Sequence, residues 1–186
     1  MTFTEERLKH ARETAEADFA KHRITREGDG RFYCGKPGTG ICHFRVIFAP
    51  RAIFLYGDIG ELVLIPSDVD SFAWAHGLRS NGEVGYPLGK IPAPLNNSAR
   101  EFCRELAVEV VAQEVADDNI NAAQAETLLD AAAEGPDAWA REWSEIAHDR
   151  EWPGAEWWTW RALYTLEALR WFVRNVEALA PAAVAS

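Results

Sequence analysis

Apolar side chains near the start of the chain recur at the three- and four-residue spacing of one helix face. They are Leu8, Ala11, Ala15 and Phe19. Thr2 and Glu5 stand at the two positions of a capping box, in which each side chain binds the backbone N–H of the other residue. The pattern therefore predicts a helix over 4–22 that buries one apolar stripe.

From residue 23 the pattern changes to short β-prone runs that are separated by turns. Two runs flank the Gly-rich turn 27–30 and predict a hairpin over 23–34. A strand is expected over 41–49, where Phe44, Val46 and Phe48 lie on one face and His43, Arg45 and Ile47 on the other. Further strands are expected over the short apolar runs 53–56 and 61–65, which turn residues separate. Because the strands follow one another directly, we expect an antiparallel sheet of four to five strands over about 23–65.

Helical spacing returns after the sheet. Ser67 or Asp68 is expected to cap a short helix near 69–79, and a long surface loop is expected over 80–97 because Gly, Pro and Asn are frequent there. The region 98–180 is expected to be helical. Its predicted helices lie over 98–117, 121–134, 137–149 and 154–179.

Two of these helices carry capping signals, from Ser98 with Glu101 and from Asn121 with Gln124. A sheet followed by helices indicates the α+β class. We therefore predict one α+β domain over 1–186, in which the sheet packs against the N-terminal helix and a C-terminal helical layer.

The net charge of −10 is unevenly distributed along the chain. Residues 1–100 carry 13 basic and 12 acidic side chains, and residues 157–186 carry three and two. Residues 101–156 carry three basic and 15 acidic side chains, so this stretch holds the whole negative excess. Its field repels phosphate backbones and attracts basic surfaces, which argues against direct nucleic-acid binding there. A solvated acidic face is the simpler interpretation.

The glycine-rich loop 35–40 does not match a phosphate-binding loop. Lys36 comes early in it, and a strand-like run follows where a helix would be needed. We expect glycines with positive φ in a turn instead. Cys34, Cys42 and His43 lack the paired spacing of a structural zinc site. We therefore predict no metal and no cofactor.

Signals for targeting or membrane insertion do not stand out. The first residues lack the basic and apolar segments of a secretory signal, and no run of about 18 apolar residues occurs. Three cysteines without framework spacing fit reduced thiols. These features predict a cytoplasmic protein with no membrane partner.

Several segments resemble a family of uncharacterised phage and prophage proteins. The matching features are the loop Tyr33-Cys34-Gly35-Lys36-Pro37-Gly38-Thr39-Gly40, the strand Phe44-Arg45-Val46, the turn Gly57-Asp58-Ile59-Gly60 and the aromatic segment 157–173. Together they cover about 30–65 and 152–175. The resemblance implies a mobile-element origin and a bacterial cytoplasm, and it supplies no catalytic residue.

These observations favour a phage-derived, non-enzymatic protein that binds a basic host protein or nucleoprotein complex. An anti-defence inhibitor of the anti-CRISPR kind would present carboxylates to a basic groove that normally holds phosphates. The residues assigned to this face are Glu101, Glu105, Glu109, Asp117, Asp118, Glu126, Asp130 and Glu134. The first three follow i, i+4, i+8 spacing and are expected to line one helix face.

Two alternatives stay open. A small enzyme or nucleotide-binding protein would use the loop and the turn, with His43, Arg45 and Asp58 around a pocket. Asp58 has a simpler role as well, since an aspartate in a Gly-flanked turn commonly binds its own backbone. A homo-oligomeric structural phage protein, for instance a homodimer, would use a predicted helix stripe of Trp157, Trp160, Tyr164 and Trp171.

Overall fold

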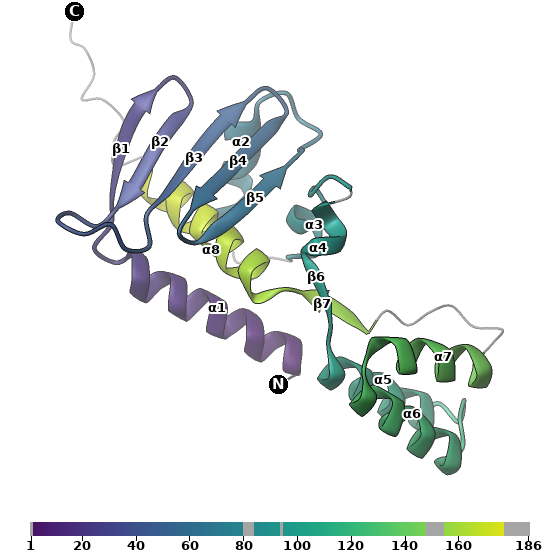
Figure 1. Ribbon diagram of the computed structural model, residues 1–186. Helices are drawn as coiled ribbons and strands as arrows, with labels where there is room; N and C mark the ends of the chain where they lie inside the picture. Colours follow the sequence, from purple (N-terminus) through teal and green to yellow (C-terminus); the bar gives the residue numbers. More distant parts are fainter. Residues whose placement is uncertain (1, 80–83, 94, 148–154, 177–186) are drawn as a thin grey trace, which may run out of the picture. The chain divides into compact units, whose positions relative to one another are not determined.

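The computed structural model describes residues 2–79, 84–93, 95–147 and 155–176 (Figure 1). Contacts divide the chain into two compact units. The first, here called the helical unit, comprises Met1–Glu5 and Arg100–Trp158; the second, the sheet unit, comprises Glu6–Ala99 and Thr159–Ser186. The helical unit therefore matches the acidic stretch that the sequence delimits at 101–156.

The sheet unit contains a five-stranded antiparallel meander, which confirms the predicted α+β class. Its strands are β1 (Arg23–Gly28), β2 (Arg31–Gly35), β3 (Phe44–Ala49), β4 (Ala52–Gly57) and β5 (Gly60–Leu64), paired in sequence order. Short turns join the strands. Gly30, Gly57 and Gly60 adopt positive φ in them, and Gly38 does so in the loop 35–40, as predicted for that loop.

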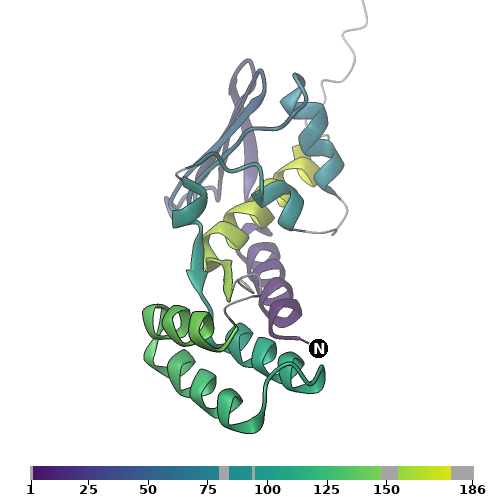
Figure 2. The ribbon, with the colours of Figure 1, turned by 90° about the vertical axis from the view of Figure 1, so that its right-hand side faces the viewer.

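Helices cover one face of this sheet (Figure 2). They are α2 (Ser71–His76) and α8 (Trp160–Asn175), while α1 (Phe3–Phe19) packs beside α8 and contacts the sheet through its last residue. Val46, Leu55 and Leu62 lie opposite one another in neighbouring strands and are buried. Phe19 of α1 contacts Phe44 and Trp171, with ring centroids 5.2 and 5.6 Å apart. The predicted burial of one α1 stripe is therefore confirmed from Ala11 to Phe19.

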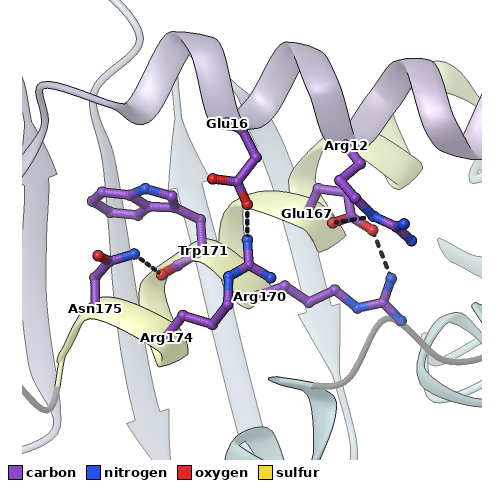
Figure 3. Close-up of polar contacts among 7 residues, drawn as sticks. All are labelled: Arg12, Glu16, Glu167, Arg170, Trp171, Arg174 and Asn175. Atoms are coloured by element: carbon purple, nitrogen blue, oxygen red, sulfur yellow. Dashed lines mark hydrogen bonds and ion pairs between the residues drawn. The ribbon is translucent and has the colours of Figure 1, made fainter.

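The central helix α8 buries two charged side chains, Glu167 and Arg170, which are 3% and 1% exposed. Arg170 Nη1 donates to Glu167 Oε1 at 2.6 Å, and Arg12 of α1 places its Nε 4.0 Å from Glu167 Oε2. Figure 3 shows these contacts together with the ion pair between Glu16 and Arg174. Each charge that α8 brings to this contact with α1 thus faces an opposite charge, as a low-dielectric interior requires.

The helical unit consists of three helices and a two-stranded ribbon. The helices are α5 (Arg104–Ala116), α6 (Ala122–Glu134) and α7 (Pro136–Ile146), and the ribbon pairs β6 (Arg100–Phe102) with β7 (Glu156–Trp158). Trp139, Trp143 and Leu128 lie in its buried core. The Asn121–Gln124 capping box is present at the start of α6, and Gly135 ends that helix, as predicted.

Some predicted boundaries are wrong. Ser98 ends the short helix α4 (Leu95–Ser98), and residues 100–102 form strand β6, so no capping box joins Ser98 to Glu101. Asp70, rather than Ser67 or Asp68, caps α2. The 80–97 loop contains α4 and the one-turn helix α3 (Gly85–Leu88), while 80–83 and 94 lie outside the described residues. The 3₁₀ turn η1 (Gly77–Arg79) extends α2.

The last helix also begins later than predicted. Trp157 and Trp158 belong to strand β7, and Thr159 caps α8 by accepting from the N–H of Ala162. Trp157 therefore does not extend the stripe formed by Trp160, Tyr164 and Trp171. The predicted last residue of the helix 137–149, and the predicted first and last residues of the helix 154–179, lie outside the described residues.

Candidate functional site

The helical unit presents its carboxylates to solvent with few cations to balance them. Its described part contains Arg100, Arg104 and Arg141 as basic side chains. Arg141 pairs with Glu142 at 2.9 Å, and Arg100 lies 4.4 Å from the centre of the Trp158 ring. In the described part of this unit, carboxylates therefore far outnumber the basic side chains that could pair with them.

Helix α6 carries a continuous acidic stripe. Glu126, Asp130 and Glu134 are separated by four residues each and are exposed. Four residues advance an α-helix by about 6 Å, so the three carboxylates follow one line along its surface. No hydrogen bond or ion pair joins them to another described side chain. Like charges at this spacing weaken a helix slightly, so the stripe is a feature that the fold tolerates rather than needs.

The stripe predicted on the preceding helix is wrong. Because α5 begins at Arg104, Glu101 lies in strand β6 and cannot share a helix face with Glu105 and Glu109. Glu109 also has a structural role, since its Oε1 accepts from the N–H of Phe3 at 3.0 Å, in the N-terminal segment of the same unit. Glu105 remains exposed near the first turn of α5.

The two aspartates after α5 lie at the turn to α6. Asp117 accepts a hydrogen bond from Gln113 Nε2 at 2.8 Å, and its own N–H caps the helix end. Asp118 has a φ of 56°, a left-handed conformation that aspartate adopts more readily than most residues. Both side chains are exposed. Their positions are therefore explained by the turn as well as by any partner.

In the sheet unit, the structure brings two of the three alternative pocket residues into direct contact. Asp58 Oδ2 lies 2.8 Å from His43 Nδ1, which also lies 2.9 Å from the carbonyl of Gly40. The N–H of Asp58 donates to the carbonyl of His43 at 3.0 Å. Both the side chain and the backbone of the turn aspartate therefore bind His43, the residue before β3.

Arg45, the third residue, lies on the same outer face of the sheet but pairs elsewhere. Its guanidinium forms two bonds to Glu27, at 3.0 and 3.3 Å, and lies 5.1 Å from the centre of the Tyr33 ring. A shallow hollow of about 390 Å³ is lined by Glu27, Tyr33, Gly40, His43 and Arg45. Sequence reasoning missed Tyr33 and Glu27, whose roles depend on cross-strand register.

A deeper cavity of about 470 Å³ lies along strand β5 of the sheet unit. Charged side chains from three positions line it: Asp58, Glu61 and Arg161. Leu62, Ile91 and Ala162 supply apolar walls, and Ser98 and Thr159 supply hydroxyl groups. Of these residues, only Asp58 was predicted from the sequence to line a pocket. Glu61 and Arg161 were missed because they lie a hundred residues apart and only the fold brings them to one cavity.

The thiols of Cys34 and Cys42 both have raised pKa values. Burial raises the pKa of the Cys34 thiol, and the nearby charge of Glu27 raises it further. Cys42 is only partly buried, yet burial and the charges of Asp18 and Asp58 raise its pKa too. Both thiols are therefore poor nucleophiles at neutral pH. Among the described residues, no group of three or more His, Cys, Asp or Glu side chains is arranged to hold a metal ion.

No family model, curated protein or solved structure matches this chain. The resemblance to phage proteins is therefore still a prediction from the quoted segments. Within the described part of the chain, no helix combines the length and the apolar composition that crossing a bilayer requires.

Proposed function

We propose that this chain is a protein-binding protein that engages a basic surface of its partner through the helical unit. The observation that carries the proposal is the coincidence of charge and structure. The stretch with three basic and 15 acidic side chains folds as its own compact unit, with its own tryptophan-containing core. A unit of this kind can present a concentrated field without involving the near-neutral remainder of the chain.

The partner's chemistry follows from the arrangement of the carboxylates. The α6 stripe and Glu105 are exposed oxygen acceptors in a region that offers few cations of its own. Arginine and lysine clusters that hold phosphates also form charge-assisted bonds with carboxylates. We therefore expect the partner to be a nucleic-acid-handling protein whose basic groove the acidic unit occupies. The resemblance to phage proteins makes a defence protein of a bacterial host the natural candidate.

The alternative of a Trp-mediated oligomer receives less support from the fold. Trp139, Trp143, Trp158 and Trp171 are buried, and the other described tryptophans are half-buried. Their indole rings therefore contribute to the cores of the two units, as in Trp139 and Trp143, whose ring centroids are 5.5 Å apart. An exposed tryptophan patch, which this alternative needs, is not found among the described residues.

Competition with DNA tests the proposed function. The full chain is immobilised, incubated with a nuclease-treated bacterial lysate, washed, and eluted with a short DNA duplex at constant ionic strength. We expect the duplex to release basic, nucleic-acid-binding proteins, because DNA and the acidic unit compete for the same groove. Release of the same proteins by buffer of equal ionic strength without DNA would contradict the proposal.

A further inference from the structure

The cavity along β5 lies wholly within the sheet unit and apart from the acidic helices. We propose that it binds a small zwitterion, a molecule with one carboxylate and one ammonium group on an apolar frame, such as an amino acid with an aliphatic side chain. The inference does not rest on the acidic helices. It rests on charges of both signs in one cavity, where Arg161 and Glu61 form no ion pair with a described residue while Asp58 lies beside His43. It also rests on the way the fold fixes these side chains, and on the size and walls of the space.

Opposite charges line the cavity without neutralising each other. Arg161 comes from α8, Glu61 from β5, and Asp58 from the β4–β5 turn. Among the described residues, no ion pair joins Arg161 to either carboxylate, and Glu61 has no described hydrogen-bond partner for its side chain. A simple anion entering here would meet the charges of Glu61 and Asp58, and a simple cation would meet Arg161. A zwitterion can pair with both signs at once.

The fold holds Arg161 over the turn that carries the carboxylates. A side chain at Gly60 would place its Cβ 2.7 Å from Cγ and Cδ of Arg161. Because glycine has no Cβ, the aliphatic part of the Arg161 side chain can pack directly against this turn. Gly60 also has a φ of +111°, which other residues rarely adopt. One turn further along α8, Thr165 Oγ1 bonds the carbonyl of Ile59 at 3.1 Å. Helix and turn are thus fixed to each other beside the cavity.

The size and the walls of the cavity suit a small molecule with an apolar part. Its volume of about 470 Å³ lies within the usual range of ligand pockets, about 300–1,000 Å³. Leu62 and Ile91 are almost fully buried and form apolar walls. Strand β5 is the last strand of the sheet, and within the described part of the chain no other strand pairs with its outer edge. Backbone groups on that edge can bind a polar ligand directly.

Three probes of one shape test the proposal on the unmodified chain. Leucine carries both charges, 4-methylpentanoate lacks the ammonium group, and 3-methylbutylamine lacks the carboxylate. Each is titrated into the ¹⁵N-labelled full chain while the amide signals of Gly57 and Gly60 are followed by NMR. We expect leucine to shift these signals and the two single-charge probes to bind about tenfold more weakly or worse, since each probe lacks one of the two charge-assisted bonds.

Variants identify the groups that recognise each charge. Arg161→Gln should weaken leucine binding about tenfold or more, and Glu61→Gln should reduce the preference for leucine over 4-methylpentanoate. Arg26→Gln, at an exposed arginine of β1, is the matched control and should bind leucine like the unmodified chain. Equal affinity for the three probes, or no shift of Gly57 and Gly60 with millimolar leucine, would overturn the proposal. Either result would leave the proposed partner binding of the helical unit unaffected.

Discussion

Thr165 and Ile59 connect two parts of the chain that lie more than a hundred residues apart. The buried hydroxyl of Thr165 shares its proton between the carbonyl of Ile59, at 3.1 Å, and the carbonyl of Arg161, at 2.8 Å. Ile59 belongs to the tight turn between β4 and β5, and Thr165 lies one turn after the start of α8. This contact fixes the central helix to the sheet and sets the position of Arg161 over Gly60.

Replacing Gly60 with alanine should destabilise the fold. The new Cβ would lie 2.7 Å from the Arg161 stem, and the backbone φ of +111° would be strained. We expect a loss of about 1 kcal/mol or more in the free energy of unfolding, measured by urea denaturation. Gly40→Ala is the control, because Gly40 has open space around it and no positive φ. Equal stability of the two variants would contradict this account of the turn.

Replacing Glu167 with glutamine should cost far more than a similar change at the surface. It removes the negative charge that faces Arg170 in the interior, where breaking an ion pair costs about 3–5 kcal/mol. Glu16→Gln removes the carboxylate that pairs with Arg174 at a partly exposed position and should cost less than about 1 kcal/mol. Thermal or urea unfolding compares the two. A Glu167→Gln variant as stable as Glu16→Gln would show that the buried pair contributes little.

Alkaline pH should destabilise the fold through Cys34. Burial raises the pKa of this thiol in the folded state, whereas the unfolded thiol ionises with its ordinary pKa of about 8.5. The stability that the neutral thiol provides is therefore complete below about pH 8.5 and is lost as pH rises above it. One such group lowers the free energy of unfolding by about 1.4 kcal/mol per pH unit.

Urea unfolding at several pH values between 7 and 10 measures this dependence. Cys34→Ala should show a shallower loss of stability above pH 8.5, together with a pH-independent offset from lost packing. Some pH dependence should remain, because burial and the charges of Asp18 and Asp58 also raise the pKa of Cys42. Near pH 10 Tyr164 adds to it, since burial and the bond to Asp18 raise its pKa. Parallel curves for the variant and the unmodified chain would show that the Cys34 thiol ionises in the folded state.

The sequence was sufficient for the sheet because each of its signals is local. Alternating apolar residues and the turn glycines defined the strands, and sequential strands then left a meander as the simplest pairing. The capping boxes of Thr2 with Glu5 and of Asn121 with Gln124 were also read correctly, and both are formed. In such motifs the bonding partners lie three residues apart, so the sequence contains the whole interaction.

Errors arose where a local signal competes with a contact between distant segments. Residues 100–102 match a helix start, yet they pair with 156–158 to form the β6–β7 ribbon. That pairing moved Glu101 off the helix and ended the predicted 101–105–109 stripe. The cavity beside β5 was missed for the same reason, because only the tertiary fold places Arg161, Glu61 and Ile91 around one space. The concentration of acidic side chains in residues 101–156 depends on no contact between distant segments, so counting charges along the sequence was enough to find it.

Charge reversal on α6 tests the proposed function most directly. The variant Glu126→Lys, Asp130→Lys, Glu134→Lys inverts the exposed stripe, and a matched control, Glu6→Lys, Glu13→Lys, Asp29→Lys, makes the same change in net charge on the sheet unit. Exposed substitutions usually change stability by less than about 0.5 kcal/mol each, so both variants should melt near the unmodified chain.

The measurement is the amount of protein that each immobilised variant captures from a bacterial lysate and releases to duplex DNA. The account predicts that the α6 variant captures none of the proteins that DNA releases from the unmodified chain, whereas the sheet-unit control captures them fully. It also predicts that capture by the unmodified chain declines steeply as salt rises and shortens the Debye length from about 10 Å at 0.1 M to about 3 Å at 1 M. Undiminished capture by the α6 variant would contradict the proposal that the helical unit binds a basic partner.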